Sequence, residues 1–267
     1  MSPRQGSGAP RAIAIVPVRV DSQRLPGKAL LAETGRPLFL HTVERALQAR
    51  CFAATYVATD SDAVDAAARK AGVPVVRTSP ACRTGSERCA EAARELDAAL
   101  VVDIQGDWPE VDPGDLEALV HCLAQAGPPT ATLAVPLSDP ARIEDPNVVK
   151  VVRARNGDAL YFSRCAIPYA RSGSVRYARL RHIGVYGFQR EVLLGIPALP
   201  SSGLDESEGL EQLRFLENGI SMRVLDAKGD PWGIETRPDY DAFLRRQAAR
   251  GGAGGAVRGG GIGEGRS

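Results

Sequence analysis

Short apolar runs alternate with segments of helical periodicity in the first half of the chain. Residues 12–16 are apolar, largely β-branched and unbroken, which is typical of a strand buried on both faces. Similar runs predict strands at residues 55–58, 73–76, 98–104 and 130–135. Apolar residues at helical spacing predict helices between them at residues 38–50, 62–71, 86–96 and 112–126. Repeated alternation of this kind predicts a parallel sheet with helices on both faces.

The alternation changes after Pro136. Three strands, at residues 148–153, 159–163 and 183–188, follow without a helix between each pair. They indicate a mixed or antiparallel region, at about residues 137–190, inserted into the parallel sheet. The rest of the pattern predicts helices at residues 190–195, 206–218 and 239–250, with a strand at 222–225. No long linker separates two units, so we expect one α/β domain over residues 12–250.

Composition excludes several classes of protein. Residues 1–11 and the glycine-rich residues 251–267 lack apolar periodicity, so we expect both ends to be disordered. A formal net charge of +1 excludes a general polybasic surface, so no nucleic acid partner is expected. Without a signal peptide or a long apolar span, we expect a cytoplasmic protein with no membrane partner. The five cysteines form no C-x-x-C pair, which argues against a zinc site or a disulfide framework.

A basic loop follows the first predicted strand. Residues 17–28 offer Arg19, Arg24 and Lys28 beside the flexible backbone of Gly27. Ligands of open α/β sheets gather outside the carboxyl ends of the strands, so these cations predict a polyanion site, with a nucleoside triphosphate as the first candidate. A solvated basic turn is the alternative. The G-x-x-x-x-G-K-[ST] spacing of a Walker loop is absent.

Two carboxylates are candidates for a Mg²⁺ site. Asp107 follows the buried strand at residues 98–104, so it is expected at the same edge of the sheet as the basic loop. A turn-forming Asp is the alternative. Glu235 precedes a helix that Thr236 can cap, and it could supply a second carboxylate to the metal. A solvated Glu at a helix start is equally common.

Other polar residues could bind the rest of a substrate. The sequence Thr84-Gly85-Ser86-Glu87-Arg88 begins a predicted helix, where free N–H groups and hydroxyls favour contacts with a base or ribose. Simple capping explains Ser86 just as well. An acceptor pocket could be formed by Arg164, His182, Tyr186, Glu211 and Gln212. Backbone hydrogen bonds that satisfy the His or Tyr are the alternative explanation.

Motifs in the order of one known family span about residues 12–245. They are R-x-x-S-x-R-L-P-G-K from Arg19 to Lys28, V-A-T-D, T-G-S-E-R, Q-G-D, P-N-V-V-K-V-V, A-L-Y-F-S-R, R-H-I-G-V-Y-G and L-E-Q-L-R-F-L-E-N-G. With these motifs the chain resembles the 3-deoxy-manno-octulosonate (Kdo) cytidylyltransferases, or CMP-Kdo synthetases. The resemblance implies a nucleotidyltransferase-type, Rossmann-like α/β fold, and a homodimer whose contact the inserted strands form. It also implies an enzyme that uses CTP and Mg²⁺ to make a CMP-linked acid sugar for lipopolysaccharide, with release of pyrophosphate.

The resemblance implies a role for each matching residue. Catalysis would fall to Arg19, Lys28 and Asp107. The nucleotide would be held by Arg19, Ser22, Arg24, Lys28, Thr84, Gly85, Ser86, Arg88 and Gln105. The acceptor would be held by Arg164, His182, Tyr186, Glu211 and Gln212. The metal would be bound by Asp107 and Glu235.

Two residues depart from the family pattern. Trp108 stands where the family usually has a Glu after Q-G-D, and its indole could narrow the acceptor pocket. Glu235 stands where the family has an Asp, and a Glu can still reach Mg²⁺. Three alternatives therefore stay open: a relative that attaches CMP to a small phosphonate such as phosphonoformate, a CTP-binding protein that has lost catalysis, and a sugar-1-phosphate nucleotidyltransferase that uses UTP or GTP.

Overall fold

The computed structural model describes residues 11–125, 127–171, 177–201 and 203–253. The two ends expected to be disordered, residues 1–11 and 251–267, lie outside the described residues apart from Arg11 and residues 251–253. No helix in the described ranges is long and apolar enough to cross a membrane.

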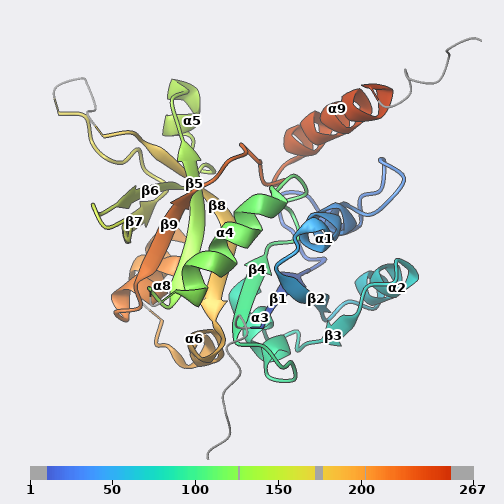
Figure 1. Ribbon diagram of the computed structural model, residues 1–267. Helices are drawn as coiled ribbons and strands as arrows, with labels where there is room; N and C mark the ends of the chain where they lie inside the picture. The colour runs from blue at the N-terminus through green and yellow to red at the C-terminus, as the bar shows by residue number, and fades with distance from the viewer. Residues whose placement is uncertain (1–10, 126, 172–176, 202, 254–267) are drawn as a thin grey trace, which may run out of the picture.

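One mixed sheet organises the molecule (Figure 1), in the order β3-β2-β1-β4-β8-β5-β9. Four of its strands pair in parallel: β1 (Ala12–Pro17), β2 (Phe52–Thr59), β3 (Val75–Arg77) and β4 (Leu100–Ile104). A second parallel pair is formed by β5 (Thr130–Pro136) and β9 (Met222–Asp226). Between β4 and β5 lies β8 (Leu180–Gln189), which is antiparallel to both. The predicted mostly parallel sheet with an antiparallel section is confirmed.

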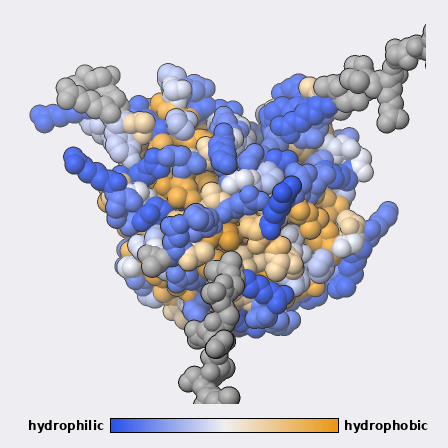
Figure 2. Space-filling view, in the orientation of Figure 1, coloured by the Kyte–Doolittle hydropathy of each residue, from blue (hydrophilic) through white to orange (hydrophobic). Residues whose placement is uncertain are grey.

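Both faces of the sheet are covered because successive strand side chains enter two different apolar cores. On β1, Ala12, Ala14 and Val16 pack into one core, and Ile13 and Ile15 pack into the other. The first core also receives α1 (Leu38–Gln48), α2 (Asp62–Lys70) and α4 (Pro113–Ala124). The second receives α3 (Gly85–Ala93), α6 (Arg190–Gly195) and α8 (Glu211–Glu217). In the view of Figure 2, hydrophilic residues cover most of the surface and hydrophobic residues group between them near its centre.

The inserted region contains a hairpin and a short helix. The hairpin strands β6 (Lys150–Arg153) and β7 (Ala159–Ser163) are antiparallel, and β6 also pairs with β8. The helix α5 (Pro140–Glu144) is capped by Asp139, whose side chain accepts from the Ala141 N–H. The sequence pattern does not predict α5, nor the 3-10 turns η1 (Lys28–Leu30) and η2 (Ile196–Ala198), because elements of five residues or fewer show too little periodicity.

The single helix predicted at residues 206–218 is wrong. The structure has α7 (Gly203–Glu208) and α8 instead, separated by Gly209 with φ of 61°. A residue in the left-handed region ends a helix and turns the chain, and only glycine adopts it without strain. The last helix, α9 (Arg237–Ala253), ends three residues beyond the predicted boundary at residue 250.

Candidate active site

An open cleft of about 1280 Å³ lies at the carboxyl ends of β1 and β4. It is lined by the loop after β1, the start of α3, the loop after β4, part of β8, the start of α8 and the segment before α9. Ligand pockets usually measure about 300–1,000 Å³, so this cleft has room for a nucleotide and a second substrate. The position agrees with the rule that ligands of open α/β sheets gather outside strand carboxyl ends.

Lys28 is held between the two predicted metal carboxylates. Its Nζ donates to Asp107 Oδ2 at 2.6 Å, to the Ile234 carbonyl at 2.9 Å and to Glu235 Oε2 at 3.4 Å. Burial disfavours the charged form of Lys28, but the charges of Asp107 and Glu235 outweigh it and raise the pKa of Lys28 above its ordinary value. The structure thus brings together three predicted site residues that are far apart in the sequence.

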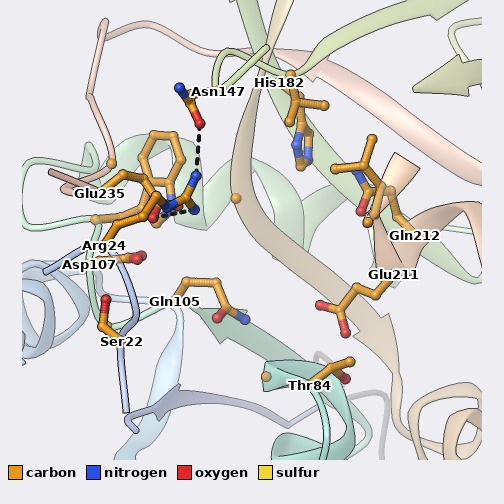
Figure 3. Close-up of a pocket in the computed structure, with 18 of the residues that line it drawn as sticks. Ser22, Arg24, Thr84, Gln105, Asp107, Asn147, His182, Glu211, Gln212 and Glu235 are labelled. Carbon is orange, nitrogen blue, oxygen red and sulfur yellow. Dashed lines mark hydrogen bonds and ion pairs between the residues drawn. The ribbon is translucent and has the colours of Figure 1, made fainter. Parts of the chain in front are cut away.

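The other residues of the basic loop lie at the same cleft. Arg24 donates to Asn147 Oδ1 and to Glu235 Oε2, both at 2.8 Å (Figure 3). Arg19 donates to the Arg83 carbonyl at 2.9 Å. The Ser22 hydroxyl accepts from the Leu25 N–H at 3.4 Å, which bends the loop. Arg19, Ser22 and Arg24 therefore line the cleft, as expected for groups that would hold phosphates.

The donor set at Lys28 fits Mg²⁺. Asp107 and Glu235 already converge on one cationic atom, and carboxylate oxygens are the protein ligands that Mg²⁺ prefers. In the part of the chain that the structure describes, no group of three or more His, Cys, Asp or Glu side chains could hold a metal ion. Two carboxylates nevertheless suffice for Mg²⁺ beside nucleotide phosphates, because this ion keeps water and phosphate oxygens as its other ligands.

The predicted base or ribose contacts divide into two groups. Thr84 caps α3, since its side chain accepts from the Glu87 N–H at 3.2 Å. Gly85 packs so closely that a Cβ there would lie 2.2 Å from Gln105 Nε2. Thr84, Gly85 and Gln105 line the cleft.

Ser86 and Arg88 do not line the cleft, in contrast to the prediction for them. Both have no exposed surface, because this side of α3 packs onto the sheet. The Arg88 guanidinium bonds to Thr78 Oγ1 at 2.5 Å and pairs with Asp60 at 3.3 Å. These contacts give Arg88 a structural role beneath the loop that precedes α3.

The five predicted acceptor residues are brought together at the other end of the cleft. Arg164 is fixed by three backbone carbonyls, those of Glu208, Pro146 and Gly209. The Tyr186 hydroxyl donates to Gln212 Oε1 at 3.3 Å. Within the described residues Gln212 Nε2 has no hydrogen-bond partner, although it is buried. A buried amide whose two N–H groups are free is suited to bind an acceptor oxygen.

His182 is neutral at physiological pH. Burial and the neighbouring Arg181 lower its pKa to about 3. Its Nε2 lies 2.9 Å from Thr132 Oγ1, and its ring packs edge-on against Phe162 at 5.0 Å. The hydrogen bond to the buried Thr132 fixes the ring, which contributes shape to the cleft wall.

Several cleft residues were not predicted from the sequence. They are Asn147, Arg142, Arg181, Trp232 and Asp103, of which Asp103 lies just beneath the cleft. The Arg181 and Arg142 guanidiniums lie 4.0 and 4.7 Å from the Trp232 ring centroid, so two cations contact the indole. A signal was present for two of them, because Asn147 and Arg181 lie in the motifs P-N-V-V-K-V-V and R-H-I-G-V-Y-G.

Known proteins are similar in sequence to most of this chain. A family model described as cytidylyltransferase matches residues 13–224. A 3-deoxy-manno-octulosonate cytidylyltransferase of Chlorobium limicola is 44% identical over 245 residues, which cover 90% of this chain and 99% of the relative. One from an Anaeromyxobacter species is 45% identical over 233 residues, which cover 86% and 94%. The chain belongs to the Kdo cytidylyltransferase family.

The structural comparison agrees with the family assignment. A solved structure of CMP:2-keto-3-deoxy-manno-octonic acid synthetase complexed with CTP matches with a TM-score of 0.83 and 34% identity, covering 91% of this chain and 99% of that one. A 4-diphosphocytidyl-2C-methyl-D-erythritol synthase from Anaerococcus prevotii matches at 14% identity with a TM-score of 0.60, and shares the fold alone. The predicted nucleotidyltransferase-type fold is confirmed, and the protein is a cytidylyltransferase.

The two departures from the Kdo cytidylyltransferase pattern have different structural consequences. Glu235 still reaches the same cation as Asp107, so the longer side chain keeps its carboxylate in place. Trp108 packs against two glycines, because a Cβ on Gly184 would lie 2.7 Å from its Nε1 and a Cβ on Gly233 would lie 3.1 Å from its Cε2. The indole thus forms a wall of the cleft between β8 and the segment before α9.

Proposed function

We propose that this protein transfers CMP from CTP to Kdo and releases pyrophosphate. One observation carries the proposal: the Lys28 ammonium lies 2.6 Å from Asp107 in a cleft whose other end gathers Arg164, Tyr186 and Gln212. A phosphate-binding cation and a metal-binding carboxylate therefore share one cleft with a polar acceptor pocket. Membership of the Kdo cytidylyltransferase family supports CTP and Kdo as the two substrates.

The chain's residues would act mainly by position and charge. An acceptor oxygen attacks the α-phosphorus in line with the departing pyrophosphate, and this substitution needs alignment and charge neutralisation more than covalent help. Lys28 and Arg19 would neutralise charge that grows on the phosphates. The free Nε2 of Gln212 and the Arg164 guanidinium would orient the acidic acceptor.

Asp107 and Glu235 would hold Mg²⁺. When bound, the ion would neutralise phosphate charge and lower the pKa of the acceptor hydroxyl. Lys28 contacts both carboxylates. With Mg²⁺ held by these carboxylates, the Lys28 ammonium would contact the CTP phosphates instead.

A small phosphonate is the second candidate acceptor, and Trp108 favours it. The indole fills space between Gly184 and Gly233 at the cleft wall. A compact dianion needs less room than an eight-carbon sugar acid.

A homodimer through the inserted strands stays a prediction. The exposed Leu160 on β7, with 63% of its surface accessible, supports an apolar contact there.

The proposal is tested by incubating the protein with CTP, Mg²⁺ and one acid at a time, and measuring pyrophosphate and the CMP conjugate. Kdo, phosphonoformate and acceptor-free reactions form the panel, with UTP and GTP as nucleotide controls. We expect turnover with CTP and Kdo. Tight CTP binding without turnover on any acid would instead identify a protein that has lost catalysis.

A further inference from the structure

A buried polar cluster lies beneath the cleft, where α3, β4 and α8 meet. Ser86 Oγ lies 3.2 Å from Asp103 Oδ2 and 3.0 Å from Glu211 Oε1. Ser86 and Asp103 have no exposed surface, and Oε2 of Glu211 is shielded from solvent. Two carboxyl groups from distant parts of the chain therefore meet at one serine hydroxyl.

The hydrogen count of this cluster constrains its charge. A serine hydroxyl has one hydrogen, so Ser86 can donate to only one of the two carboxyl groups. If Asp103 and Glu211 were both ionised, the other would face an oxygen lone pair, and two negative charges would lie close together away from water. One added proton satisfies both contacts, because the protonated carboxyl donates to Oγ while Oγ–H donates to the carboxylate.

The groups around the cluster do not provide enough positive charge to balance two ionised carboxylates. Cys89 of α3 and Tyr186 of β8 face Asp103, and both are neutral because burial raises their pKa. The charge of Arg214, on the same helix as Glu211, favours the ionised form of Glu211, but Arg214 Nη2 pairs with Glu87 Oε1 at 3.2 Å. The cluster therefore lowers its charge by keeping a proton.

The pKa directions agree with this reading. Burial, and then the charge of Glu211, raise the pKa of Asp103 well above its ordinary value. Burial also raises the pKa of Glu211, against the opposing hydrogen bonds of Thr84 and Ser86. Two such groups titrate as a pair.

We propose that Asp103 and Glu211 share one proton through Ser86, and that Asp103 in this state positions the side-chain amide of Gln105 in the cleft. Gln105 Nε2 donates to Asp103 Oδ1 at 2.8 Å and to Oδ2 at 3.0 Å. The amide is thereby fixed with Nε2 on Asp103 and Oε1 directed away from it. Asp103 is a positioning residue, since it acts on the substrates only through Gln105.

The position of Gln105 links the buried Asp103–Ser86–Glu211 cluster to the cleft. In the view of Figure 3, Gln105 lies between Asp107 and Glu211, where the metal side of the cleft meets the acceptor side. Loss of the shared proton would leave both carboxylates charged and would break the Ser86 bridge. The inference rests on the proposed function in one respect, namely that Gln105 contacts a substrate.

Asp103→Asn tests the proposal directly. An Asn can accept from Gln105 with Oδ1 and donate to Ser86 with Nδ2, so it keeps the shorter Gln105 contact and the Ser86 contact of the singly protonated pair but cannot lose its proton. It gives up only the longer contact of Gln105 with Oδ2. We expect kcat/KM near neutral pH to be within about threefold of that of the unmodified protein. As pH rises above neutral, kcat/KM of the variant should fall less than that of the unmodified protein. Asp103→Leu removes the acceptor for Gln105, and we expect it to raise KM more than tenfold.

An infrared measurement separates this inference from the proposed function. The unmodified protein should show a carboxylic acid C=O band at neutral pH that Asp103→Asn lacks, and this readout needs no turnover. The proposal is overturned if the band is unchanged by Asp103→Asn. It is equally overturned if Asp103→Asn raises KM as much as Asp103→Leu, because Asp103 would then have to be charged.

Discussion

Lys28 Nζ and Asp107 Oδ2 lie 2.6 Å apart, although 79 positions separate the two residues in the chain. Lys28 comes from the loop after β1 and Asp107 from the loop after β4, and the parallel pairing of these strands places both loops at one sheet edge. The contact is thus a consequence of the sheet, and it puts a partly buried cation and a carboxylate where a triphosphate and its metal would bind.

Replacing Lys28 should mainly slow the chemical step. Lys28→Ala removes a cation whose contacts strengthen as charge grows on the phosphates, so we expect kcat to fall more than about tenfold, equivalent to about 1.4 kcal/mol. Steady-state kinetics with saturating CTP measure this. Lys70→Ala, at the exposed end of α2, is the matched control and should retain activity. A rise in KM without a change in kcat would show that Lys28 only binds.

Glu235 should govern the response to magnesium. Glu235→Gln removes one of the two carboxylates, and we expect the Mg²⁺ concentration at half-maximal rate to rise by roughly tenfold or more. Glu235→Asp keeps the charge and should remain close to the unmodified protein. Mg²⁺ titrations of the initial rate compare the variants. Equal Mg²⁺ requirements in both variants would remove Glu235 from the metal site.

Local sequence patterns predicted most of the fold, and they were least informative where distant segments pair. The run at residues 12–16 showed a buried strand, because its side chains fill cores on both faces. The place of β8 between β4 and β5 depends on long-range pairings such as Asp103 with Tyr186, which no local pattern encodes. The break at Gly209 was hidden because Leu210 and Leu213 keep helical spacing beyond it.

For the candidate site, too, local motifs were informative and long-range contacts were not predicted. The loop carrying Lys28 and the strand end carrying Asp107 were visible as motifs, and the structure joins them. The motif around Ser86 and Arg88 suggested nucleotide contacts, but the helix turns both side chains towards the sheet. The polar Asp103 within a buried strand acquired meaning only when α3 and α8 supplied its partners.

Trp108 should control which acceptor enters. Trp108→Ala removes the wall against Gly184 and Gly233, so we expect the ratio of kcat/KM for Kdo to that for phosphonoformate to change by more than about tenfold, a difference of about 1.4 kcal/mol. Trp108→Phe retains an aromatic wall and should shift the ratio less. An unchanged ratio in the Ala variant would mean that the indole serves packing alone.

A side chain at position 85 should displace Gln105. Gly85→Ala places a methyl group 2.2 Å from the Gln105 amide, so Gln105 must move, and we expect KM for CTP or the acceptor to rise by roughly tenfold. Gly195→Ala is the matched control, because no atom lies within 4 Å of a Cβ there. Normal KM values in Gly85→Ala would show that the position of Gln105 does not matter for binding.

His182 and His41 should make the fold less stable in acid. Burial is the main cause that lowers their pKa values, to about 3 and about 4, from an ordinary value of 6.5. Below pH 6.5 the unfolded chain therefore binds protons that the folded chain does not, so the free energy of unfolding falls as pH falls. The slope is about 1.4 kcal/mol per pH unit for each such proton. Urea unfolding between pH 6 and 4.5 measures how the free energy of unfolding depends on pH. His182→Gln should reduce this slope by the contribution of one proton, about 1.4 kcal/mol per pH unit. An unchanged slope in that variant would mean that His182 is protonated in the folded protein.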